Sequence, residues 1–137
     1  METLFEEAEK LFYDSIYEES FVAFEKIAKD SNCEESLRAE AYNMMGVIIS
    51  GPAPYLSKDE DESGLEYFKA ALKLDDKNLG AALNILEGYQ TSPTGHSDRE
   101  SVELACNLLK KGCWDELSEE DKTLVINTQK KLPIEHQ

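Results

Sequence analysis

The segments 39–46 (AEAYNMMG) and 64–75 (GLEYFKAALKLD) place small and aromatic residues at helical spacing. Gly46 ends the first segment, and in the second segment Phe68 follows Gly64 by one helical turn. A helix face that carries glycine lets a second helix approach closely, and an aromatic ring fills the space beside the contact. Both segments are therefore predicted to be helices that carry small and aromatic residues.

These positions resemble the two halves of a tetratricopeptide repeat, a hairpin of two helices about 34 residues long. Tyr42, Met45 and Gly46 stand where the first helix of such a repeat carries aromatic, apolar and small residues. Ala71 stands at a small-residue position of the second helix. The acidic pair at 75–76 follows, where the family has a proline. The resemblance implies that the two helices pack closely, with Gly46 facing its partner helix near Gly64 to Phe68.

Two further copies of the pattern are visible in the chain. The segment 1–34 has Leu4 and Ala8 at matching places, but Glu7 stands where an apolar residue is expected. A weaker copy covers residues 79–112. The resemblance therefore implies three hairpins, at about residues 1–34, 39–78 and 79–112, followed by a capping helix at about 118–131.

Apolar residues recur at intervals of three and four along most of the chain, which is typical of amphipathic helices. Glycine and proline clusters at 50–58 and 91–95 predict two long loops. Ser118, with Asp121 three residues later, predicts a capped helix start, and Gly112 predicts a helix end. Seven helices are expected, at about 2–13, 17–29, 34–50, 60–74, 78–90, 98–111 and 118–131.

No segment alternates in the manner of a strand, so the predicted class is all-α. The resemblance implies a right-handed α-α superhelix of about three helix hairpins plus the C-terminal capping helix, all within a single domain covering 1–137. A generic helical bundle with chance matches to the repeat is the alternative.

The charge of the chain is strongly acidic, with 29 acidic residues against 14 basic ones and a net charge of −15. Residues 1–35 hold eleven acids and three bases, which is a net charge of −8 and more than half of the total. Such a field repels nucleic acid and anionic membranes and attracts basic proteins. A basic protein partner is therefore expected, although acidic charge that serves solubility alone is the alternative.

Residues that could carry chemistry are scarce. The acidic segment 59–64 (DEDESG) resembles the first half of a calcium-binding loop, but the glutamate that should complete the loop falls at Ala70. The only histidines are His96 and His136, and no metalloprotease, phosphate-loop or serine-nucleophile motif occurs. We therefore expect no enzyme activity, no metal site and no cofactor.

Three cysteines occur without a CxxC motif, and an odd number is not the pattern of a disulfide framework. The apolar spacing predicts Cys106 in a core, whereas Cys33 and Cys113 are predicted in loops. The acidic N-terminus lacks the basic start and apolar stretch of a signal peptide. No apolar run reaches the roughly 18 residues needed to span a bilayer. A cytoplasmic protein is expected.

Tetratricopeptide-like repeats bind partners on a concave face made by the first helix of each pair, so the resemblance implies a partner-binding surface there. A subset of the family grips C-terminal carboxylates of chaperones with basic residues and asparagines. Only Asn84 matches that pattern here, so chaperone-tail binding is not expected. Trp114 is expected to pack the capping helix or, alternatively, to serve as an exposed anchor. The residues implied on the concave face are Glu2, Phe5, Glu9, Glu40, Asn43, Val47, Leu83 and Glu87.

Two functions fit these expectations. The first is an immunity or inhibitor type of protein that neutralises a basic toxin or effector, because negative charge speeds the capture of a cationic partner. The second is a tetratricopeptide-like adaptor or secretion-type chaperone that holds a partner segment. Both are protein binding without catalysis.

Overall fold

The computed structural model describes residues 2–57, 64–91 and 99–132, with no side-chain placement for residues 2 and 91. The described residues form seven α-helices, two short 3-10 turns and no strand. The predicted all-α class is therefore confirmed for this part of the chain. The elements are α1 (Glu2–Tyr13), α2 (Tyr17–Ala28), α3 (Glu35–Ser50), η1 (Pro54–Leu56), α4 (Gly64–Leu74), α5 (Leu79–Thr91), α6 (Arg99–Gly112), η2 (Trp114–Glu116) and α7 (Glu119–Lys131).

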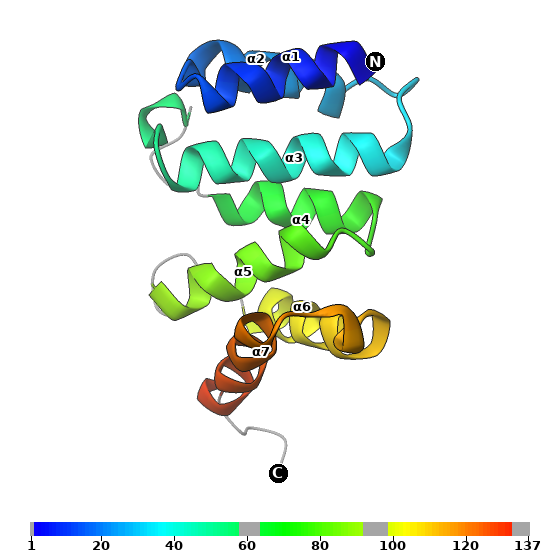
Figure 1. Cartoon of the computed structure of the whole chain (residues 1–137), viewed down its shortest axis with the longest axis vertical. Coiled ribbons are helices and arrows are strands. Elements are labelled where there is room, and N and C mark those ends of the chain that lie inside the picture. The colour runs from blue at the N-terminus through cyan, green and yellow to red at the C-terminus, as the bar shows by residue number, and fades with distance from the viewer. Residues whose placement is uncertain (1, 58–63, 92–98, 133–137) are drawn as a thin grey trace. The chain divides into compact units, whose positions relative to one another are not determined.

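The chain divides into two compact units, Met1–Ala81 and Ala82–Gln137, so the boundary lies within α5. In the first unit, α1 packs on α2, α2 packs on α3, and α3 packs on α4 (Figure 1). The arrangement of three hairpins in one right-handed superhelix stays a prediction, as does the pairing of α5 with α6.

The core of the first unit lies between consecutive helices. Phe24 and Ile27 of α2 and Met45 and Ile48 of α3 are all shielded from solvent. Burying a side chain of this size stabilises the folded state by about 1.5–3 kcal/mol. The spacing of three residues within each pair puts both members on one helix face, which explains why the helical period in the sequence located them.

The contact between α3 and α4 has the predicted geometry. A Cβ atom added to Gly46 would lie 2.5 Å from Cε1 of Phe68, so the ring occupies the space that a side chain would need. Gly64 lies against the Gly46 carbonyl oxygen, at 2.7 Å from the position of an added Cβ. The prediction that Gly46 faces Gly64 and Phe68 is therefore confirmed.

The turn between α1 and α2 contains a residue in the left-handed region. Ser15 has φ 65°, the one positive φ outside glycine among the described residues. The Ser15 N–H donates to the Phe12 carbonyl at 3.0 Å, and the Ile16 N–H donates to the Leu11 carbonyl at 2.8 Å. These two hydrogen bonds form a Schellman motif, which ends α1 and turns the chain directly into α2.

The predicted loop at 50–58 is more ordered than expected in its described part, residues 50–57. It contains η1, which packs on α3, and Ala53, which is fully buried. The Ala53 N–H donates to the Ile48 carbonyl at 3.0 Å, so the segment folds back onto the end of α3. Thr91, the first residue of the predicted loop at 91–95, is instead the last residue of α5. Residues 92–95 and the acidic segment at 59–63 lie outside the described residues, as do His96 and His136.

The second unit buries one face of α6, at Val102, Ala105 and Leu109. Its α7 begins where the sequence predicts, because the Asp121 N–H donates to Ser118 Oγ at 3.1 Å. The amide of Gln90 donates to the Thr128 hydroxyl at 3.1 Å and so joins the end of α5 to α7.

Candidate functional site

The predicted concave-face residues of the first unit are partly engaged in its packing. Phe5 is half-buried, and its ring meets Phe24 edge to face with centroids 5.4 Å apart. Glu9 and Val47 are half-buried, and the side chain of Glu2 lies outside the described residues. Phe5 therefore supports the core in addition to any role at a surface.

Glu40 is held in a hydrogen-bonded cluster. Its Oε1 accepts from the amide of Asn43 at 3.0 Å and from the amide of Asn78 at 3.2 Å. Asn78 in turn caps α5, because its Oδ1 accepts from the Ala81 N–H at 2.9 Å. Asn43 is buried and Glu40 is half-buried. The Glu40 carboxylate therefore fastens α3 to the start of α5.

Leu83 and Glu87 belong to the second unit, whereas the other predicted residues belong to the first. Leu83 is half-buried and Glu87 is exposed. A concave surface shared by all eight residues therefore stays a prediction.

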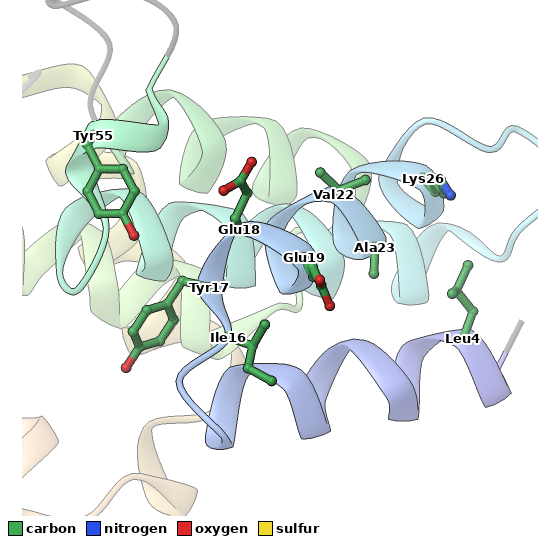
Figure 2. Close-up of a pocket in the computed structure, with 9 residues that line it drawn as sticks. All are labelled: Leu4, Ile16, Tyr17, Glu18, Glu19, Val22, Ala23, Lys26 and Tyr55. Carbon is green, nitrogen blue, oxygen red and sulfur yellow. The ribbon is translucent and has the colours of Figure 1, made fainter.

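An open groove of about 580 Å³ lies elsewhere in the first unit, along the outer face of α2 (Figure 2). Leu4 of α1 borders one end, and Tyr55 of η1 approaches the other end near Tyr17. The full lining is Leu4, Ile16, Tyr17, Glu18, Glu19, Val22, Ala23, Lys26 and Tyr55.

The apolar part of this groove is unusually exposed. Ile16 is 42% exposed, Val22 is 45% exposed and Tyr55 is 72% exposed, and these are three of the six large hydrophobic side chains that the described chain leaves in solvent. Clustered apolar exposure of this kind marks interaction surfaces, whereas single exposed hydrophobic residues are ordinary. The groove is therefore the best candidate for a docking surface in the described part of the first unit.

Charged side chains border the same groove. Glu18 and Glu19 lie in the first turn of α2, where negative charge also stabilises the helix dipole. Lys26 lies two turns further along the helix. Within the described residues, these three side chains make no ion pair or hydrogen bond with another side chain, whereas the neighbouring Lys29 pairs with Glu25 at 3.2 Å.

The residue pattern did not predict this groove, because the repeat resemblance implies binding on the first helix of each pair. Most of the groove belongs instead to a second helix, α2, and to η1. One local signal was available: Val22 is apolar but lies off the buried face that Phe21, Phe24 and Ile27 define. No residue pattern near Tyr55 indicates that this residue of η1, which follows α3 in the chain, lies beside α2.

The three cysteines are all buried, so the expectation that Cys33 and Cys113 are loop residues holds only for their secondary structure. Burial raises the pKa of Cys106 to about 11. Burial, with a smaller contribution from Asp30, raises the pKa of Cys33. Burial and then Glu116 raise the pKa of Cys113. Since the thiolate is the nucleophile, none of the three is suited to nucleophilic chemistry at neutral pH.

The described residues hold no group of three or more histidine, cysteine or acidic side chains placed to bind a metal ion. Trp114 is half-buried in η2, with Lys122 Nζ 5.9 Å from the centre of its ring. This cation–π contact ties η2 to α7 but leaves both expectations for Trp114 open.

No protein-family model, curated protein or solved structure matches this chain. None of the described helices combines the length and the apolar character that crossing a membrane requires.

Proposed function

We propose that the chain is a non-enzymatic protein-binding module and that it binds a cationic partner in the α2 groove. The observation that carries this proposal is the combination of exposed apolar side chains with the carboxylates of Glu18 and Glu19 in one groove. Apolar contact supplies affinity, and complementary charge orients the approaching partner and raises the association rate.

The favoured use of this surface is neutralisation of a basic toxin or effector in the cytoplasm. The net charge of −8 in residues 1–35 surrounds the groove with a negative field, because α1 and α2 both belong to this segment. Such a field accelerates capture of a basic protein, and the acceleration decreases with ionic strength. Rapid capture is what an inhibitor of a toxin requires.

An adaptor or secretion-type chaperone built on tetratricopeptide-like hairpins is the second candidate. The exposure of Ile16, Val22 and Tyr55 favours it, because a chaperone holds apolar segments. The small-residue contacts within α1–α2 and α3–α4 support the repeat-like arrangement that this candidate assumes. The two candidates differ in the fate of the partner. A neutraliser abolishes the partner's activity at equal stoichiometry, whereas an adaptor leaves that activity intact.

The groove assignment is tested with two matched pairs of adjacent glutamates. Glu18→Gln/Glu19→Gln and Glu6→Gln/Glu7→Gln each remove two negative charges from exposed helix positions, but only the first pair lines the groove. The probe is a synthetic helical peptide of about 14 residues, or about 21 Å, with leucines on one face and lysines at both ends of that face. It is called the KK peptide.

Stopped-flow association at low and high salt measures the effect of each pair. We expect the groove pair to slow association of the KK peptide several-fold at low salt, and the control pair to slow it less, because charge acts mainly on association. Equal slowing by both pairs, or no slowing by either, would show that the groove is not the binding surface. Neutralisation is then measured as loss of activity of a partner captured from host cells and identified by mass spectrometry.

A further inference from the structure

The groove has an acidic end and a basic end on a single stripe of α2. Glu19, Val22, Ala23 and Lys26 follow one another at i, i+3, i+4 and i+7, which places them on one helix face. Glu18 and Glu19 lie about 11 Å from Lys26 along the axis, from the 1.5 Å rise per residue. The surface between these charges is apolar. Tyr55 lies near the acidic end of the groove, where α2 begins (Figure 2).

The walls of the groove favour a helical ligand. Its described lining residues belong to helices and turns, which expose side chains to a ligand. None of them belongs to a strand whose backbone N–H and C=O groups could pair with an extended segment. An extended segment would therefore find no ladder of backbone partners, whereas a helix satisfies its own backbone hydrogen bonds. Amphipathic helices bind in such grooves through apolar anchors at intervals of three and four residues.

We infer that the groove binds an amphipathic helix in one polarity. A lysine or arginine of that helix lies against Glu18 and Glu19, bulky apolar side chains lie against Val22 and Tyr55, and an acidic side chain two turns away lies against Lys26. The inference rests on the proposed function and adds to it the shape and the charge order of the bound segment. A helix with basic residues at both ends of its face would place positive charge against Lys26, and the two like charges would repel each other.

The test uses the KK peptide together with a second probe, the KE peptide, in which glutamate replaces lysine at one end of the same face. Dissociation constants of both peptides are measured by fluorescence anisotropy at low salt, for the wild type and two variants. Lys26→Glu reverses the charge at the basic end of the groove. Lys10→Glu is the matched control, because Lys10 is an exposed helix lysine that does not line the groove.

The comparison concerns the ratio of the two dissociation constants. Because the two peptides differ by two unit charges, Lys10→Glu measures the shift in this ratio that net charge alone produces. We expect Lys26→Glu to shift this ratio toward the KK peptide by about threefold, the strength of one exposed ion pair, and Lys10→Glu to shift it clearly less. Equal shifts in both variants, or no shift in either, would overturn the inferred polarity. That failure is distinct from failure of the proposed function, which would appear as KK binding that ignores Glu18→Gln/Glu19→Gln.

Discussion

In both helix pairs of the first unit, the two helices approach closely at a small residue. The pairs differ in whether a side chain fits between the two backbones. Between α1 and α2, the buried Ser20 hydroxyl donates to the Ala8 carbonyl at 2.8 Å. Between α3 and α4, Gly64 lies against the Gly46 carbonyl, with no room for a Cβ atom. In each pair a small residue of the second helix faces the backbone of a small residue in the first. The α1–α2 contact admits a hydroxymethyl group, whereas the α3–α4 contact excludes even a methyl group.

The aromatic ring beside each contact shows the same difference. Phe24 packs edge-on against Phe5 of α1, so ring meets ring across the first pair. Phe68 packs directly over Gly46, so ring meets backbone across the second pair. The α3–α4 pair therefore depends on the absence of side chains, and substitutions that add atoms should damage it more than the α1–α2 pair.

The largest effect is expected for Gly46→Leu. The added side chain would overlap the Phe68 ring. Overpacking typically lowers the free energy of unfolding by about 1–3 kcal/mol, and we expect the upper end of this range here. Urea unfolding followed by circular dichroism measures the change. Gly88→Leu is the control, because a Cβ atom added to Gly88 meets no atom within 4 Å. Equal stability of Gly46→Leu and the wild type would contradict the close α3–α4 contact.

A smaller loss of stability is expected for Gly64→Ala. The new methyl group would overlap Ser50 Oγ and lie 2.7 Å from the Gly46 carbonyl oxygen, so the two helices must separate slightly. We expect a loss of about 2 kcal/mol, within the usual range for overpacking. Adding Ser50→Ala removes the overlap with the hydroxyl but not the contact with the backbone, and should restore only part of the loss. Full restoration would mean that Ser50, and not the proximity of the helices, limits the site.

The smallest effect is expected at the α1–α2 pair, for Ser20→Ala. The change leaves the packing volume almost unaltered and removes one buried hydrogen bond, which contributes about 1 kcal/mol to the free energy of unfolding. The Ala8 carbonyl keeps its hydrogen bond within α1, so no buried acceptor is left without a donor. A loss as large as that of Gly64→Ala would show that the α1–α2 pair depends on this hydrogen bond as strongly as the α3–α4 pair depends on its glycine contact.

Local patterns in the sequence predicted the seven helices, and the resemblance to a helical repeat implied the contact of Gly46 with Phe68. Helix formation depends on residues three and four positions apart, and glycines, prolines and caps such as Ser118 mark the ends within the same short range. The close contact followed from the resemblance, because Gly46, Gly64 and Phe68 match the small and aromatic positions at which such repeats pack their two helices.

Only the tertiary structure decided where the candidate site lies and which carboxylates are available to a partner. The groove requires Tyr55 of η1 beside α2, and Glu40 is engaged because Asn78, 38 residues away in the chain, donates to it. Such contacts depend on how the chain returns to itself after each loop. The acidic charge and the helical pattern are properties of short segments and could be read directly, whereas the exposure or engagement of a given side chain is a property of its distant neighbours.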